Sequence, residues 1–295
     1  MLPTLIEVGD FRIHTFGVMV AVGFIMGIWW CGREAGRVGA DKNKILDLTF
    51  WLLISGMLGA RILFVIVNWG DYWQFLQDQI PRSGVPLAIG QWLVEMLSIR
   101  KGGIVWYGGL LLAFGVGVLF MRRNGLSVWP TSDLVSPGVM LGLAFGRLGC
   151  LAAGDDHGRV VESAWETVKA GGNAPWWTLT FTNPQSLIPE NLLGKPLYPT
   201  QLMVSGKDFL IFAILVLLRQ RKTFPGMITW AMMAFYAVAR FWVELYRGDT
   251  GRGFVIEGYL STSQAIGAAS FAVSVAMLVY LARTHRAAER AGLKA

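Results

Sequence analysis

Three arginines interrupt the most apolar stretches of the sequence, at Arg61, Arg147 and Arg240. A guanidinium keeps its proton at physiological pH, and placing one at the centre of a bilayer costs at least about 2.5 kcal/mol. Such a group faces the protein interior, an acidic partner or a bound anion. Guanidinium groups bind phosphate oxygens in pairs, and a low dielectric strengthens that contact. The three arginines therefore predict a site for a lipid phosphate, with acidic pairing or snorkelling to the interface as the alternative.

The composition indicates a membrane protein. Of the 295 residues 54% are hydrophobic and only 15% are charged, and the mean hydropathy is +0.49. Soluble domains usually carry about 25% charged residues. The formal charge of +7 does not indicate a nucleic-acid partner, because the basic residues stand in short clusters beside the apolar runs. That arrangement is typical of membrane topology signals. We expect an all-α, polytopic membrane protein.

Seven transmembrane helices are predicted, each from an apolar run of about 20 residues. Their ranges are 12–31, 45–68, 104–121, 133–153, 202–218, 226–246 and 261–282. The short loops 32–44, 122–132 and 219–225, with the tail after 282, carry 13 Lys and Arg. The alternate loops carry eight over a much greater length. The positive-inside rule therefore predicts an outer N-terminus and a cytoplasmic C-terminus.

The chain is expected to form a single transmembrane domain, 1–295, with long outer loops at about 69–103 and 154–201. The first loop contains PLAIGQWLVEMLSI, which is too short to span and is expected to lie in the interface or to re-enter. The N-terminus lacks the basic region of a cleavable signal peptide, so the first span is expected to stay.

The three arginines are predicted to share a depth. Their helices all run from the cytoplasm outwards, and the arginines stand 16, 14 and 14 residues from the predicted starts at 45, 133 and 226. At 1.5 Å per residue this is roughly 21–24 Å from the inner side. Glu244 follows Arg240 by four residues and is a possible partner, and Arg247 continues the same helix face.

A set of motifs occurs in a specific order. The strongest, GRLGCLAAGDDHGR, is similar to the signature GRLGN-F-x-N-G-E-x-x-G-R of one enzyme family. The others are HTFGVMV, GARILFVI, WYGGLLLAFGVG, YPTQL, RFWVELYRGD and STSQA. On these segments the chain resembles the prolipoprotein diacylglyceryl transferase family, and the resemblance covers most of the chain.

The resemblance implies an enzyme of the bacterial cytoplasmic (inner) membrane. Its substrates would be phosphatidylglycerol, among the membrane lipids, and a prolipoprotein signal peptide with a lipobox cysteine. The diacylglyceryl group would pass to the thiol, forming a thioether and releasing glycerol phosphate. Arg147 and Arg240 would be catalytic, stabilising the phosphate as its charge develops. The substrate-binding positions would be Arg61, Asp155, Gly158, Gln201, Glu244 and Arg247. No cofactor or metal ion is expected.

The sequence departs from the family at several polar positions. Tyr107 stands where the family has a histidine proposed as the base, and we place it with the catalytic residues. A phenol is a poor base at pH 7, but it can donate a hydrogen bond to phosphate. The acceptor thiol would then lose its proton to water near the cations. The further departures are Phe16, Cys150, Ala153, Asp155, Tyr198, Met203 and Val204.

Other candidate residues have simpler interpretations. Cys150 is a possible nucleophile, but a small buried residue in a helix contact is favoured. His157 is a possible substitute base, with a solvated loop histidine favoured. The GDDHGR segment is a weak metal-ligand set, and Asp208 is expected near a cytoplasmic helix end. The alternative functions are an anionic-lipid transporter or flippase, or a paralogue with another acceptor or no activity.

Overall fold

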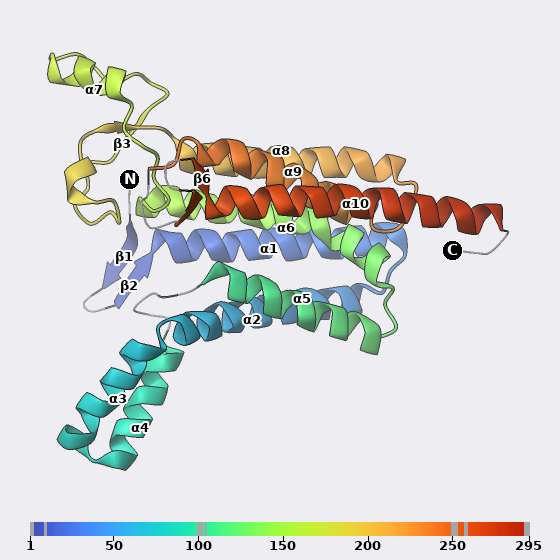
Figure 1. The fold of residues 1–295 in the computed structure, drawn as a ribbon, viewed down its shortest axis with the longest axis horizontal. Coiled ribbons are helices and arrows are strands. Elements are labelled where there is room, and N and C mark those ends of the chain that lie inside the picture. The colour runs from blue at the N-terminus through green and yellow to red at the C-terminus, as the bar shows by residue number, and fades with distance from the viewer. Residues whose placement is uncertain are drawn as a thin grey trace. The chain divides into compact units, whose positions relative to one another are not determined.

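The computed structural model describes residues 3–8, 11–98, 103, 105–248, 253–256 and 259–291. Helices dominate the fold, as predicted, and Figure 1 shows the long ones lying side by side within each part of the chain. The α-helices are α1 (Thr15–Val38), α2 (Lys42–Val67), α3 (Trp69–Ser83), α4 (Val85–Leu97), α5 (Trp106–Arg123), α6 (Val128–Ala153), α7 (Glu162–Lys169), α8 (Thr200–Leu218), α9 (Met227–Glu244) and α10 (Thr262–Arg290).

Three antiparallel pairs of short strands accompany the helices. They are β1 (Thr4–Val8) with β2 (Phe11–His14), β3 (Leu179–Thr180) with β4 (Pro196–Leu197), and β5 (Phe254–Ile256) with β6 (Leu260–Ser261). Two 3₁₀ turns, η1 (Glu190–Leu192) and η2 (Arg219–Arg221), complete the elements. The chain forms two compact units, unit 1 with Met1–Val38 and Trp129–Ala295, and unit 2 with Gly39–Val128.

Five helices of the described chain are long and apolar enough to cross a membrane, so the protein is a multi-pass membrane protein. They are α1, α2, α6, α8 extended by η2, and α10. All seven predicted spans are helical, but α5 and α9 are not among the five candidates. Each has 18 residues and includes two charged side chains, Arg122 and Arg123 in α5 and Arg240 and Glu244 in α9. These charges lower the mean hydropathy of the two helices.

The first and last transmembrane helices differ from their predicted ranges. The first span was predicted from residue 12, but residues up to His14 form β2 and α1 begins at Thr15. The last helix begins where predicted, because Ser261 and Gln264 form a reciprocal capping box within the STSQA motif. The helix then continues past the predicted end at 282 to Arg290, since alanine and long charged residues favour helix.

Glycines bring α1 and α6 of unit 1 into close contact. A Cβ atom on Gly23 would lie 2.5 Å from the carbonyl oxygen of Gly142, and one on Gly27 would lie 2.9 Å from that of Gly138. Ser205 Oγ of α8 donates a 2.8 Å hydrogen bond to the Ala144 carbonyl of α6. Helix α6 is thus fixed from two sides, and it carries Arg147.

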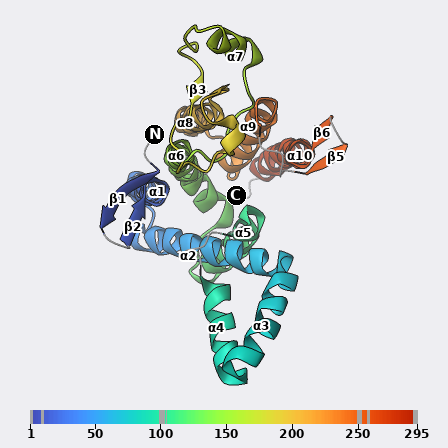
Figure 2. The same ribbon diagram turned by 90° about the vertical axis from the view of Figure 1, so that its left-hand side faces the viewer.

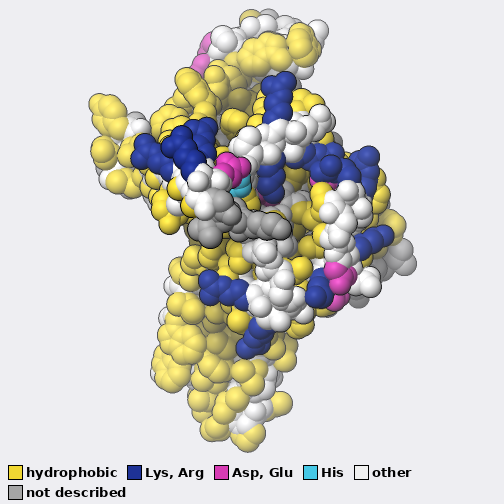
Figure 3. Space-filling view, turned by 90° about the vertical axis from the view of Figure 1, so that its right-hand side faces the viewer, with side chains coloured by type: hydrophobic (Ala, Val, Ile, Leu, Met, Phe, Trp, Pro, Cys, Tyr) yellow, Lys and Arg dark blue, Asp and Glu magenta, His cyan; other side chains and the backbone are white. Residues whose placement is uncertain are grey.

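Within unit 1 the helices run alternately. The end of α6, the start of α8 and the end of α9 meet at one end of the unit, where Figure 2 looks onto α7 and the short strands. Basic residues cluster at the other end, shown in Figure 3. Those of unit 1 lie on the ends of α1, α8 with η2, and α10: Arg33, Arg37, Arg219, Arg221, Lys222, Arg283, Arg286 and Arg290.

Unit 2 is built on the antiparallel pair α2 and α5. Lys44 Nζ donates to the Asn124 carbonyl at one end of the pair, and the Val105 amide donates to the Ala60 carbonyl at the other. The segment predicted as a long outer loop, 69–103, holds the helices α3 and α4. Helix α4 covers most of the PLAIGQWLVEMLSI stretch, and its interfacial position stays a prediction.

Candidate functional site: an arginine cluster at one end of unit 1

Two arginines from distant parts of the chain bind one carboxylate. Arg147 Nη1, near the end of α6, pairs with Oδ2 of Asp156. Arg247 Nη2, just after α9, pairs with Oδ1 of the same residue. The Arg247 side chain is 6% exposed, whereas those of Arg147 and Asp156 are 23% and 22% exposed. The structure thus brings two predicted site residues to a single anionic group that remains partly accessible.

Arg240 belongs to the same cluster. Its Nη2 atom lies 3.1 Å from Oε2 of Glu244, one helical turn later, as the spacing predicted. Its charge also interacts with those of Arg147 and Arg247. Its Nη1 atom is buried and has no hydrogen-bond partner among the described residues. Three guanidiniums, those of Arg147, Arg240 and Arg247, thus gather around the carboxylates of Asp156 and Glu244.

The first turn of α8 holds the loop that carries Asp156. Thr200 Oγ1 donates a 2.8 Å hydrogen bond to the Asp156 carbonyl, and Gln201 Nε2 donates a 2.9 Å bond to the Asp155 carbonyl. Gln201 is 1% exposed, and its Oε1 atom has no partner within the described chain. The exposed Asp155 carboxylate accepts the Asp156 amide at 2.8 Å. Asp155 and Gln201 therefore position the loop.

Gly158 lies where three backbone segments converge. It pairs with Arg247 in an antiparallel bridge, and a Cβ atom on it would lie 2.3 Å from the Tyr198 carbonyl oxygen. The Gly248 amide donates to the His157 carbonyl at 3.0 Å. A side chain at residue 158 would separate the segments that hold Asp156 and Arg247 together, so glycine is required by close approach.

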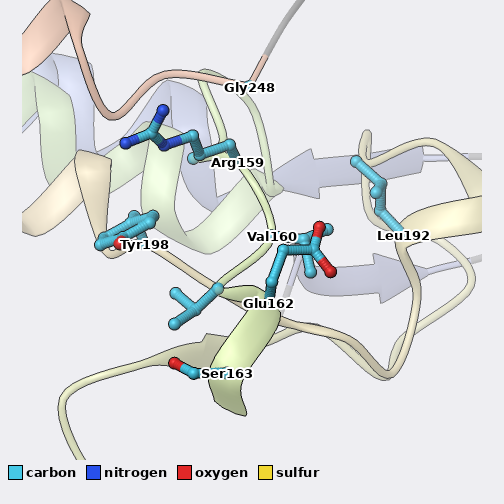
Figure 4. Close-up of a pocket in the computed structure, with 9 residues that line it drawn as sticks. Arg159, Val160, Glu162, Ser163, Leu192, Tyr198 and Gly248 are labelled. Carbon is cyan, nitrogen blue, oxygen red and sulfur yellow. The ribbon is translucent and has the colours of Figure 1, made fainter. Parts of the chain in front are cut away.

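A pocket adjoins this crossing. It has a volume of about 540 Å³ and is lined by residues that include Gly158, Glu162, Leu192 and Gly248. Figure 4 shows Arg159 and Tyr198 on one side of the pocket and Leu192 on the other. The Arg159 guanidinium lies 5.5 Å from the Tyr198 ring centre and 6.0 Å from that of Tyr246, which fixes it by cation–π contacts.

A buried polar pair lies in α8. Lys207 Nζ pairs with Oδ1 of Asp208 and lies 4.0 Å from the centre of the Tyr236 ring of α9. Asp208 is 1% exposed and is the ninth residue of a 19-residue helix, so its predicted position near a helix end is wrong. The Asp208 charge interacts with Arg147 and Arg240, which links this pair electrostatically to the cluster.

Two predicted site residues belong to unit 2, and each is described there by itself. Arg61 is 6% exposed and donates to the carbonyls of Met96, Glu95 and Gly103 at 2.7–2.8 Å and to the Tyr72 hydroxyl at 2.9 Å. Carbonyl oxygens of three residues thus accept hydrogen bonds from its guanidinium. Tyr107 lies in the first turn of α5, is 41% exposed, and packs edge-on against Trp106.

Two secondary candidates now have defined environments. His157 is 6% exposed with Nδ1 3.1 Å from the Gly158 carbonyl, so the predicted solvated histidine is wrong. The loop folds back beneath residues 246–248, which sequence alone does not indicate. Cys150 is buried, as favoured, and lies 3.9 Å from Nη1 of Arg147. Both cysteines, Cys31 and Cys150, are free thiols.

The acidic loop does not favour a metal site. Cys150, Asp155 and Asp156 can place one ligand atom each within 4.8 Å of one another, and His157 is not in that group. Arg147 Nη1 already contacts Cys150 and Asp156, so a cation lies at this point. A second, metallic cation would be repelled there.

The predicted site residues did not include Asp156, Lys207 or Asp208. Adjacent charged residues inside a predicted span are rare in membrane helices, and that signal at 207–208 would have identified the buried pair. The contact of Asp156 with Arg247 has no such signal, because 91 residues separate the two in sequence.

The cluster can bind an anion whose charge grows during a reaction. Fixed guanidiniums stabilise developing negative charge without reorganising at the moment of reaction. Two of them already bind the two oxygens of one group, and a third lies close enough to interact. This is the donor set expected for a phosphate group that becomes a more highly charged leaving group.

Comparison with known proteins agrees with this chemistry. The family model for prolipoprotein diacylglyceryl transferase matches residues 3–280. A phosphatidylglycerol–prolipoprotein diacylglyceryl transferase of Bacillus mycoides is 28% identical over 285 residues, covering 97% of this chain and 94% of the relative. The enzyme of the same name from Geobacillus kaustophilus is 27% identical, covering 93% and 90%. The chain belongs to the prolipoprotein diacylglyceryl transferase family.

Proposed function

We propose that this protein transfers the diacylglyceryl group of phosphatidylglycerol to the lipobox cysteine of a prolipoprotein. The thiolate sulfur attacks the glyceryl carbon that bears the phosphate, a carbon–sulfur bond forms, and the carbon–oxygen bond breaks. The electron pair of that bond stays on the phosphate oxygen, and glycerol phosphate leaves. The thiol proton passes to water. The names of the relatives and the family of this chain support this reaction.

The convergence of Arg147 and Arg247 on a single carboxylate carries the proposal within the molecule. The phosphodiester of phosphatidylglycerol has one negative charge, and the leaving monoester acquires a second. A site whose donors are three guanidiniums therefore attracts the doubly charged leaving group more strongly than the singly charged substrate headgroup. Interactions that strengthen in this way lower the barrier.

The residues of unit 1 divide into two roles. Arg147, Arg240 and Arg247 bind the phosphate, and Glu244 fixes the orientation of Arg240 through the 3.1 Å contact. Asp155, Gly158 and Gln201 shape the loop that carries Asp156 against the arginines. The buried Lys207–Asp208 pair beneath the cluster adds no net charge.

The residues of unit 2 act differently. Tyr107 is the catalytic candidate of this unit: it is 41% exposed, and its phenol can donate a hydrogen bond to an anion where the family has a histidine proposed as the base. Arg61 acts indirectly, because its donors tie Glu95, Met96 and Gly103 to α2.

The protein crosses the bacterial inner membrane seven times in this proposal. Helices α5 and α9 are each about 27 Å long at 1.5 Å per residue, close to the roughly 30 Å hydrocarbon thickness. Basic residues gather at one end of the helices of unit 1, shown in Figure 3, and this end faces the cytoplasm. The N-terminus is then outside and the arginine cluster lies towards the outer leaflet.

Reconstitution tests the function. The purified protein in phosphatidylglycerol vesicles is incubated with a synthetic lipobox peptide, and mass spectrometry follows the gain of one diacylglyceryl group on cysteine. The peptide with serine in place of cysteine and vesicles of phosphatidylcholine are the controls, and both should give no product. Absence of the adduct under conditions where the Bacillus mycoides relative forms it would refute the proposal.

A further inference from the structure

Asp156 is held in an uncommon backbone conformation. Its φ of 54° is the only positive value at a non-glycine position in the described chain, and Gly154 has a φ of 82°. The Asp156 carbonyl is fixed by Thr200 and its amide by Asp155. Aspartate and asparagine enter the left-handed region more readily than other side chains, but it is still a minority conformation. The loop thus directs this carboxylate back onto Arg147 and Arg247.

We propose that Asp156 is a built-in competitor for the phosphate site. In the lipid-free enzyme its carboxylate occupies the position that the lipid phosphate takes during the reaction. This inference rests on the proposed function, because it concerns the same arginines. Asp156 is a positioning residue in this role: it holds Arg147 and Arg247 at the spacing of one anion, and it leaves when the phosphate arrives.

Repulsion among the clustered arginines explains why the chain places a carboxylate, that of Asp156, in the phosphate site. Clustered guanidiniums in a poorly hydrated site repel one another and lose hydration, so an empty site without a counter-ion would be unfavourable. Asp156 supplies that counter-ion from within the chain. A carboxylate and a phosphate both offer a guanidinium two oxygens that share negative charge, so one can replace the other.

The fit of Asp156 is incomplete, which makes it displaceable. Its two oxygens serve Arg147 and Arg247, while Nη1 of Arg240 stays buried without an acceptor among the described residues. A phosphate has additional oxygens and can serve the third arginine as well. Arg147 and Asp156 are each more than a fifth exposed, so the exchange can take place from the surrounding medium.

The same competition assists product release. Glycerol phosphate carries more charge than the lipid headgroup and would otherwise bind the arginines more tightly than the substrate does. A carboxylate on a fixed loop reoccupies the site without diffusing to it, as a ligand tethered at high effective concentration does. Asp156 therefore weakens the binding of both substrate and product and speeds turnover at the release step.

The test compares Asp156→Asn and Asp156→Gly with the parent protein. Both replacements tolerate a positive φ, so they remove the charge while keeping the loop. Glu166→Gln is the matched control, because that carboxylate is exposed on α7 and pairs with Lys169 rather than with an arginine of the cluster. Binding is measured without turnover, using nanodiscs of phosphatidylglycerol, nanodiscs of phosphatidylcholine and free glycerol phosphate. The diacylglyceryl-transfer assay then gives KM, kcat and the inhibition constant of glycerol phosphate.

We expect both Asp156 variants to bind phosphatidylglycerol and glycerol phosphate about tenfold more tightly, the scale of one charge-assisted hydrogen bond. KM and the inhibition constant should fall together and kcat should not rise. Binding of the Asp156 variants to phosphatidylcholine nanodiscs should equal that of the parent protein. Glu166→Gln should match the parent protein in every measurement. Unchanged or weaker binding in both folded variants would overturn the inference, as would tighter binding limited to one of them. A parent protein that transfers no lipid would refute the proposed function, while the binding arms would still decide the role of Asp156.

Discussion

Removal of the Arg147 guanidinium tests the proposed chemistry most directly. In Arg147→Ala the charge is lost at the end of α6, while Arg240, Arg247 and Asp156 remain. Insertion should be unaffected, because alanine is less costly than arginine within a membrane helix. We expect lipid transfer to fall severely while the amount of folded protein stays the same.

The magnitude follows from the contacts. Arg147 uses one guanidinium nitrogen on Asp156 and would place two donors on a phosphate. A hydrogen bond to a charged group contributes about 1.5–3 kcal/mol, and we take the lower value because the side chain is 23% exposed. Two such bonds give roughly 3 kcal/mol, which corresponds to a loss of about 10²-fold in kcat/KM.

The assay uses proteoliposomes, the lipobox peptide and mass spectrometry at several lipid concentrations. Arg147→Lys should retain part of the activity, since it keeps the charge but loses the paired geometry. Arg221→Ala is the control, because this exposed arginine lies in η2 at the opposite end of unit 1. If Arg147→Ala retained activity within threefold of the parent and Arg221→Ala did the same, the phosphate role of Arg147 would be wrong.

Three further substitutions test the packing and the unit 2 residues. Gly23→Ala should destabilise the protein, because the added Cβ would lie 2.5 Å from the Gly142 carbonyl oxygen. Gly36→Ala in the same helix is the control, since its Cβ would meet nothing within 4 Å. Thermal unfolding in detergent compares the two variants, and equal melting temperatures would contradict the α1–α6 contact. Arg61→Met should cost roughly 3–5 kcal/mol of unfolding free energy, because it leaves buried carbonyls without donors, and a loss of activity with full stability would contradict a tying role. Tyr107→Phe should lower kcat/KM by about three- to tenfold, the effect of one neutral hydrogen bond, and complete inactivity would instead show that the hydroxyl takes part in proton transfer.

The sequence was sufficient for the helices and the family. Apolar runs predicted all seven long helices, since hydrophobicity and helix-end signals are local properties of the chain. The ordered motifs predicted the family, and the model match over residues 3–280 confirms it. The i, i+4 spacing predicted the contact between Arg240 and Glu244, because helix geometry alone brings such residues together.

Tertiary structure decided which groups meet the buried charges. Arg61 binds carbonyls 34–42 residues away, and Arg247 binds an aspartate 91 residues away. Those contacts depend on where the chain places α4, Gly103 and the loop after α6, which no local pattern encodes. The burial of His157 has the same origin, since the 246–248 segment covers it. The sequence determines which residues are charged, but the long-range path of the backbone determines which carboxylate or carbonyl each one contacts.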